Sequence, residues 1–394
     1  MLDALTPDTQ ATLLLVGQFS KTAEAKPLTL AEYNGLAKQL LDLRLRPADL
    51  LRELPNGLLV DTARLAALLS RGTSLALAVE RWGQLGIGVI GRGDEAYPKH
   101  LKRKLRGAAA PVLYIAGNRD LLNAEGVCAV GSRNASDAGI QFASELGKRC
   151  AEEGLTIVSG DARGIDRAAM DGALEKGGSV TGVLVEALTK AVLSKRNREA
   201  ILAGKLTLVS PYDPEAGFTI PKAMDRNKYL YALASAAVVI DSDIKGGTWS
   251  GAVENDKHRW TPAFVRASFD APIGNQKLAA RGLREVSFQD LASNIRALFF
   301  SDQNDSQQQM DLLRRNEVEG ETKVGAGPKS MYPHFLSELT AFLNDSGPQS
   351  VLEVSERFDL EENQAERWLE RALRDEVLEK LQRPVRFTLK RGEG

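Results

Sequence analysis

The sequence predicts an α/β protein built on a doubly wound parallel sheet. Between residues 127 and 267, a strand-like segment is followed by a helix-like segment five times. The strands are short, unbroken apolar runs such as Val127–Val130, which is typical of strands buried on both faces of a parallel sheet. Glycine turns follow the first two strands and lead into helices. These observations indicate a sheet covered by helices on both faces.

The first strand–helix–strand unit covers residues 127–166. Its first strand ends in a glycine turn, and Ser136 is in position to cap the following helix. A second buried strand is predicted at residues 155–158, and Gly160 and Gly164 allow a tight turn into the next helix. Because helix N-termini attract anions, the two turns place two anion-seeking helix ends side by side.

The alternation continues to residue 267 with four more strands and four more helices. We expect helices at 166–176, 188–203, 222–235 and 248–257, and strands at 180–185, 206–210, 237–240 and 263–267. In such sheets, ligands bind at the carboxyl ends of the strands, where the strand order reverses.

Residues 1–82 read as a separate helical module, since leucines recur at spacings of three and four and proline breaks the pattern into short helices. The sheet domain is predicted to occupy residues 83–300. It opens with strands at 87–90 and 112–115. A basic run between them either touches phosphate or forms a solvated face, and comprises Lys99, Lys102, Arg103, Lys104 and Arg106.

The C-terminal part is predicted to be a polar linker, residues 301–330, followed by a winged-helix-like domain, residues 331–394. Three helical segments precede two short strands that turn at Pro384. This domain carries 13 Asp and Glu against 9 Lys and Arg. Its third helix is charge-balanced, so a surface for a partner protein is at least as good an interpretation as a DNA-reading module.

Composition places the chain among cytoplasmic proteins. Its net charge is −1, while residues 85–300 carry 29 Lys and Arg against 24 Asp and Glu. No apolar run approaches the roughly 18 residues that span a membrane, and no basic flank with a cleavage site marks a secretion signal. Cys128 and Cys150 fit buried, reduced thiols.

Several catalytic classes are disfavoured. The turn after Val130 lacks the three-glycine spacing of the NAD fingerprint, and no phosphate-loop or GxSxG sequence is present. Only three histidines occur, and none has metal-ligand spacing. The sequence thus predicts no catalytic residue, no metal and no cofactor. Any catalysis would rest on carboxylates that are better read as caps and turn acceptors: Asp161, Asp166, Asp241, Asp243 and Glu254.

Cations stand beside the glycine turns at the expected ligand edge of the sheet. Together they favour a phosphate-binding groove, although each alone could be a surface charge. The predicted phosphate or DNA ligands are Gly131, Ser132, Arg133, Gly160, Arg163, Gly164, Lys222, Arg226, Asn227, Lys245, Gly246 and Gly247.

Five ordered motifs carry a family resemblance: VGSRNASDAG, IVSGDARGID, MDRNKYLYALASAAVVID, IKGGTWSGAVEN and IGNQKLAARG. In order and spacing they resemble the DNA-processing protein family DprA (Smf) over residues 85–290. The resemblance implies a Rossmann-like protein that binds single-stranded DNA, forms a homodimer through that domain and helps to load a RecA-type recombinase, for example during natural transformation. By this resemblance Arg133 is a phosphate ligand, Lys245 a DNA-binding lysine, and Arg226 with Asn227 the family's Arg-Asn pair.

The sequence also departs from the family pattern. Ala223, Met224 and Asp225 occupy the place where members usually carry a base-contacting phenylalanine, so electrostatics are predicted to dominate over stacking. Asp161 and Trp249 are likewise unusual in their turns. The alternative interpretation is a nucleotide-binding or nucleotide-cleaving protein, for example in defence against foreign DNA, with Asp161, Asp241 and Glu254 as its first candidate carboxylates.

Overall fold

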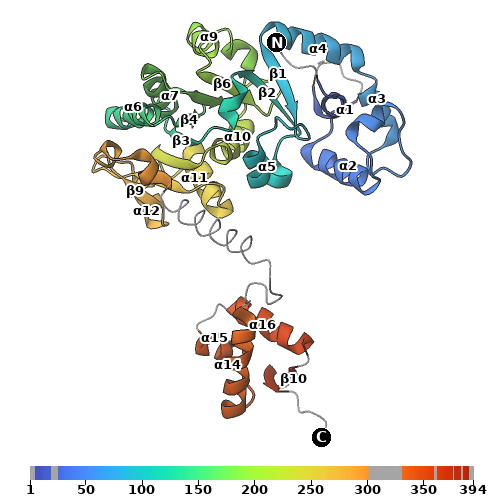
Figure 1. Ribbon diagram of the computed structural model, residues 1–394, viewed down its shortest axis with the longest axis vertical. Coiled ribbons are helices and arrows are strands. Elements are labelled where there is room, and N and C mark those ends of the chain that lie inside the picture. Colours follow the sequence, from blue (N-terminus) through green and yellow to red (C-terminus); the bar gives the residue numbers. More distant parts are fainter. Residues whose placement is uncertain are drawn as a thin grey trace, which may run out of the picture. The chain divides into compact units, whose positions relative to one another are not determined.

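The chain forms two compact units, Met1–Gln308 and Gln309–Gly394 (Figure 1). The computed structural model describes residues 5–18, 25–300, 331–358, 362–375, 377–382 and 385–389. The predicted linker 301–330 therefore lies outside the described residues. The helical module and the sheet belong to the first unit, and the division of the chain into four segments remains a prediction.

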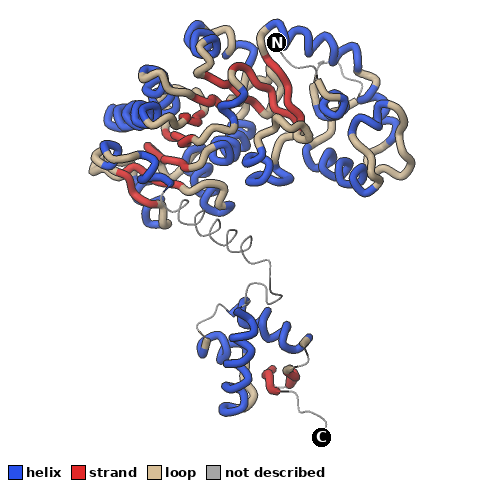
Figure 2. Tube along the Cα trace, viewed as in Figure 1, coloured by secondary structure: helices blue, strands red, loops and turns tan. Residues whose placement is uncertain are grey.

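A sheet of nine strands forms the centre of the first unit (Figure 2). Its strands are β1 Ile87–Gly91, β2 Val112–Gly117, β3 Gly126–Gly131, β4 Thr156–Ser159, β5 Val180–Val183, β6 Leu206–Ser210, β7 Ala236–Asp241, β8 Ala263–Arg266 and β9 Arg284–Val286. Their order is β1-β2-β6-β5-β4-β3-β7-β8-β9. Every pairing from β6 to β9 is parallel, which confirms the doubly wound sheet.

Two helical layers cover the sheet. Helices with defined bounds in the described part of this unit are α1 Pro7–Val16, α2 Leu30–Asp42, α3 Thr62–Leu69, α4 Gly72–Gln84, α5 Lys99–Leu105, α6 Asp137–Glu152, α7 Ile165–Glu175, α8 Leu188–Ala191, α9 Lys195–Leu202, α10 Ile220–Leu233, α11 Gly247–His258 and α12 Ile273–Ala280. Residues 295–300 are also helical. Short 3-10 turns lie at Pro47–Leu51 (η1), Arg106–Ala108 (η2), Arg119–Leu122 (η3) and Asp290–Ala292 (η4).

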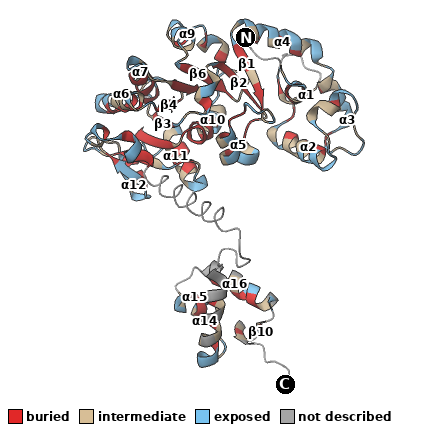
Figure 3. Cartoon of the chain, in the orientation of Figure 1, coloured by how far each residue is buried: buried red, intermediate tan, exposed pale blue. Residues whose placement is uncertain are grey.

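Strand β3 shows how the apolar runs divide between the two layers. Val127 and Ala129 belong to the core formed with α6 and α7, whereas Cys128 and Val130 belong to the core formed with α5, α10 and α11. All four residues are buried. Figure 3 likewise shows the strands of the sheet largely in the colour of buried residues. Because neighbouring strand residues point to opposite faces, an unbroken apolar run fits a sheet that is covered twice. Cys128 and Cys150 are free and buried, as predicted.

The helical module has a small core of its own, and apolar residues of α1 and α4, among them Leu13 and Trp82, also belong to the core of the sheet. Polar contacts add to this packing. Asp94, three residues after β1, accepts hydrogen bonds from the hydroxyls of Thr6, which caps α1, and Thr9 on α1, both at 2.7 Å. The guanidinium of Arg92 donates to Asn34 Oδ1 on α2 at 2.7 Å. These contacts join the loop after β1 to helices α1 and α2 of the module.

The second unit contains α14 Met331–Ser346, α15 Val351–Arg357, α16 Glu362–Arg374 and a hairpin of β10 Leu378–Gln382 and β11 Val385–Leu389. Its core includes Phe335, Leu339, Leu369 and Phe387. The predicted order of three helices and a hairpin is confirmed. The winged-helix assignment itself remains a prediction, and the expected turn at Pro384 lies outside the described residues.

Two sequence expectations need correction. The helix expected over 188–203 is two helices, because the Ser194 hydroxyl accepts a hydrogen bond from the Asn197 backbone N–H at 3.4 Å and starts α9 afresh. The basic run at 99–106, which was expected to contact phosphate or to form a solvated face, is mostly helical. Its Lys104 is half-buried. The Lys104 ammonium donates to the Ala234 carbonyl at 2.6 Å and to the Thr261 hydroxyl at 2.7 Å. This lysine therefore links α5 to the segments after α10 and α11.

Candidate phosphate-binding site at the carboxyl edge of the sheet

The strand order reverses at β3, which lies between β4 and β7. A pocket of about 350 Å³ lies at this point, beyond the carboxyl ends of β3 and β7, and we call it the switch-point pocket. Predicted ligands that line it are Gly131, Ser132, Arg133, Arg226, Asn227, Lys245, Gly246 and Gly247. The fold therefore brings eight of the predicted ligands, from three separate segments of the chain, into the lining of one pocket.

The turn after β3 is packed against the start of α7. A Cβ on Gly131 would lie 2.4 Å from Ile165 Cγ1, and one on Gly164 would lie 2.4 Å from the Ser132 carbonyl oxygen. Gly164 also has φ +85°, which favours glycine. The close packing leaves the Arg133 side chain exposed at the pocket, while Arg163 donates to Asn134 Oδ1 at 2.9 Å beside it. Neither Arg163 nor Gly164 lines the pocket itself.

The turn after β7 brings a second exposed cation and a helix end. Lys245 is exposed, Gly246 has φ +95°, and α11 begins at Gly247 with no side-chain cap. The Asn227 side-chain amide donates to the Gly247 carbonyl at 3.0 Å and fixes this turn to α10. The first amide N–H groups of α11 therefore have no side-chain cap, and the exposed Lys245 precedes the helix by two residues.

A buried charge pair lies under the pocket. Arg226 is 6% exposed, and its Nη1 donates to the Val183 carbonyl at 2.9 Å. A Cβ on Gly160 would lie 1.9 Å from that Nη1 and 2.6 Å from Asp166 Oδ2, so only glycine fits between the two charges. Burial raises the pKa of Asp166 to about 6, against the opposing effects of Arg226 and of the Gly160 N–H, which donates at 3.1 Å. Burial likewise lowers the pKa of Arg226.

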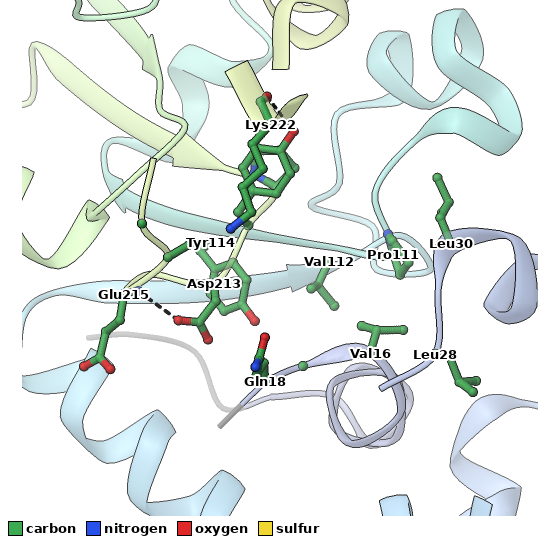
Figure 4. Close-up of a pocket in the computed structure, with 15 residues that line it drawn as sticks. Val16, Gln18, Leu28, Leu30, Pro111, Val112, Tyr114, Asp213, Glu215 and Lys222 are labelled. Carbon is green, nitrogen blue, oxygen red and sulfur yellow. Dashed lines mark hydrogen bonds between the residues drawn. The ribbon is translucent and has the colours of Figure 1, made fainter. Parts of the chain in front are cut away.

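Lys222 lies apart from the other predicted ligands. It lines a different pocket, of about 510 Å³, between the end of α1, strand β2 and the loop after β6 (Figure 4). Its ammonium lies 5.7 Å from the centre of the Tyr212 ring. Burial raises the pKa of the nearby Asp213. Lys222 is thus not assembled with Arg133 and Lys245.

Phe218 is a pocket residue that sequence reasoning missed. It is 41% exposed, lines the switch-point pocket, and has the Arg133 guanidinium 5.4 Å from its ring centre. An exposed aromatic beside a cation is a usual element of single-strand binding surfaces. The signal in the sequence was an aromatic residue next to Gly217 in a polar, proline-rich loop that precedes a helix.

The first three candidate carboxylates of the enzymatic alternative, Asp161, Asp241 and Glu254, do not converge, whereas Asp166 and Asp243 line the switch-point pocket together with Asp241. Asp241 lines the switch-point pocket and is buried, which raises its pKa. Asp161 forms ion pairs with Arg196 at 3.0 Å and Arg167 at 3.5 Å in a neighbouring pocket, and Glu254 lies on α11 outside both linings. Over the ranges that the structure describes, no group of three or more His, Cys, Asp or Glu side chains could hold a metal ion.

Comparison with known proteins gives concordant matches. The sequence profile of the DNA recombination-mediator protein A family matches residues 88–282. The DNA processing protein DprA of Streptococcus pneumoniae is 32% identical over 160 residues, which cover 39% of this chain and 54% of that protein. The chain therefore spans about half the length of this curated relative.

One solved structure supports the fold. The crystal structure of DNA processing protein A from S. pneumoniae matches with a TM-score of 0.55 and 21% identity, covering 74% of this chain and 98% of that one. A structure of DNA processing protein A from Helicobacter pylori, reported for its single-stranded DNA binding mode, also matches. Its TM-score is 0.46 with 23% identity, and the match covers 54% of this chain and 95% of that one. Among the described residues, no helix has the length and apolar character needed to cross a membrane.

Proposed function

Because the chain belongs to the DNA recombination-mediator protein A family, we propose that it binds single-stranded DNA at the switch-point pocket and acts there without catalysis. The observation that carries this proposal is the pair of exposed cations, Arg133 and Lys245, on one pocket beside the uncapped N-terminus of α11. Cations and backbone N–H groups at one edge suit successive phosphates of one strand.

The recessed shape favours a single strand over a duplex. A flexible strand can bend into a pocket between loops, whereas duplex DNA has a persistence length of about 50 nm and resists bending. Two of the three carboxylates in the lining, Asp166 and Asp241, are buried. The third, Asp243, is exposed, and its Oδ1 accepts a hydrogen bond from the Ile244 backbone N–H at 2.7 Å. A phosphate at the surface therefore meets two exposed cations, Arg133 and Lys245, and one exposed carboxylate.

The test of this function compares three kinds of ligand. We expect labelled single-stranded oligonucleotides to shift in a gel at concentrations where a duplex of the same sequence does not. We also expect neither NAD nor ATP to raise the melting temperature, because a ligand that binds only the folded state must stabilise it. A clear thermal shift with either nucleotide, accompanied by product formation, would instead support the nucleotide-cleaving alternative.

The bound strand is proposed to be handed to a RecA-type recombinase by a homodimer. A second copy would cover apolar side chains between β7 and α12, where Ile244, Phe269 and Ile273 are 36%, 103% and 51% exposed. The start of α12 lies against the segment after β7, since a Cβ on Gly274 would lie 2.2 Å from the Ser242 carbonyl oxygen. The segment that carries Ile244 therefore lies beside the start of α12, which carries Ile273, and Phe269 lies in the loop that leads into α12.

Phe269→Glu is expected to convert the dimer to a monomer, because it places a charge in the apolar contact. Light scattering after size-exclusion chromatography measures the change. Leu77→Glu, at a residue on α4 that is 64% exposed, is the matched control and should leave the mass unchanged. A dimeric Phe269→Glu protein would contradict this interface.

Deleting residues 331–394 is expected to leave single-strand affinity within about threefold, roughly 0.7 kcal/mol. The reason is the charge of this segment, 13 acidic against 9 basic residues, which gives phosphate no net attraction. Fluorescence anisotropy with the truncated and full chains measures the difference. A loss much greater than threefold would make the segment a DNA-binding module.

A further inference from the structure

The switch-point pocket continues into a second pocket along the same edge of the sheet. This second pocket has a volume of about 490 Å³ and lies beyond the ends of β4 and β5, and we call it the β4–β5 pocket. Both linings include Arg133, Ala162, Phe218 and Arg226. The two pockets therefore share a wall and form neighbouring parts of one groove.

The β4–β5 pocket combines an apolar floor with a cationic rim. Leu184 and Val185 are 6% and 8% exposed, and they line it together with Ala187. Lys190, on α8, is exposed at the same pocket. An apolar surface with a cation at its edge suits the face of a base and the phosphate beside it.

The charges of this pocket favour an anion. Its lining holds four cations, Arg133, Arg167, Lys190 and Arg226, against two carboxylates, Asp161 and Glu186. Of the cations, Arg226 is buried and Arg167 is paired with Asp161, which leaves Arg133 and Lys190 exposed for an anion. Asp161 is 8% exposed at its side chain and already forms ion pairs with Arg167 and Arg196. A phosphate near Lys190 would therefore be opposed mainly by the single exposed carboxylate, Glu186.

The loop that carries Phe218 is fixed to this pocket. The backbone N–H of Ala187 donates to the Ala216 carbonyl at 2.9 Å, and that of Thr189 donates to the Pro214 carbonyl at 3.1 Å. The Arg133 guanidinium, which belongs to the same shared wall, lies against the Phe218 ring. The aromatic ring is therefore held at the boundary between the two pockets and keeps 41% of its surface open to solvent.

We propose that the β4–β5 pocket is a second nucleotide subsite for the same single strand. The strand passes from Lys245 and Arg133 across Phe218, which stacks on one base, and its next phosphate is held by Lys190. This inference rests on the proposed function, and it deepens that function by giving the strand a direction along the edge from β7 towards β5. It also supplies an aromatic platform that lies outside the family's usual position.

A length series of oligothymidylates tests the subsite. Lys190→Glu is expected to weaken binding about tenfold for strands long enough to reach both pockets, and to lower their salt slope by about 0.7. Binding of the shortest strands should be unchanged, because they occupy only the switch-point pocket. The matched control is Lys205→Glu, since Lys205 is exposed just before β6, at the opposite edge of the sheet.

A second measurement addresses Phe218. Phe218→Ala is expected to weaken binding by about fivefold or more without changing the salt slope, since it removes the stacking of one base but no charge. The quenching of a 2-aminopurine base in the strand should fall in parallel. Phe288→Ala, at a phenylalanine that is 52% exposed outside both linings, is the control.

The outcomes separate the subsite from the function. If the parent protein binds no oligothymidylate, the proposed function fails. If the parent binds and Arg133→Glu weakens it, but Lys190→Glu equals Lys205→Glu at every length, the function stands and the subsite is overturned. Unchanged affinity and quenching in Phe218→Ala would overturn the stacking role.

Discussion

Reversing the charge of Arg133 or Lys245 is expected to weaken binding of single-stranded DNA by about ten- to hundredfold at low salt. Each variant removes a charge-assisted hydrogen bond to phosphate, worth about 1.5–3 kcal/mol, and adds a repulsion. The slope of log affinity against log salt should fall by about 0.7 for each phosphate that is no longer neutralised, for every base sequence alike. Anisotropy titrations of the parent, Arg133→Glu and Lys245→Glu over a range of salt concentrations measure both quantities.

Lys205→Glu makes the same change in net charge at the amino edge of the sheet and is the control for long-range effects. It should shift affinity only slightly, because exposed charges beyond about 10 Å are screened at 0.1 M salt. If Arg133→Glu and Lys245→Glu both behave like Lys205→Glu, the DNA lies elsewhere on the molecule and the switch-point site is wrong.

The core of the fold could be predicted because its signals are local. The apolar run Val127–Val130 and the cap at Ser136 act through neighbouring residues, and the Ser136 hydroxyl indeed accepts from the Gly139 N–H at 3.1 Å. The direction of β1 and β2 could not be predicted, because it depends on the pairing of β2 with the distant β6. The break at Ser194 was also missed, since apolar spacing on both sides of it suits one continuous helix.

The site was predicted to the extent that it follows from topology. Arg133 and Lys245 lie in the turns that follow the parallel strands β3 and β7. Because ligands bind at the carboxyl ends of parallel strands, both residues can be placed there without knowledge of packing. Arg226 looks like a surface cation at a helix start, and its burial depends on Asp166 and Val183 in other segments. Phe218 was missed for the same reason, because its position follows from loop contacts that no local pattern encodes.

Asp166 and Arg226 form the part of the site on which the stability of the fold should depend most. The folded-state pKa of Asp166, about 6, is above its unfolded value of about 3.9, so its ionisation costs stability as the pH rises through this window. Arg226 limits that cost by facing the carboxylate. Removing one member of a buried pair typically costs about 3–5 kcal/mol, because the other charge is left uncompensated.

Arg226→Met is therefore expected to lower the free energy of unfolding by about 3–5 kcal/mol at pH 8 and by clearly less at pH 5. At pH 5 the Asp166 carboxyl is largely protonated in the folded parent and in the folded variant, so the attraction between Arg226 and Asp166 is absent from both. In the parent at this pH, Arg226 itself has no counter-charge at Asp166. Urea denaturation at the two pH values measures the difference. The double variant with Asp166→Asn should recover part of the loss at pH 8, because no buried charge remains. An equal loss at both pH values, with no recovery in the double variant, would show that Arg226 stabilises the fold by packing and its bond to the Val183 carbonyl and not by its charge.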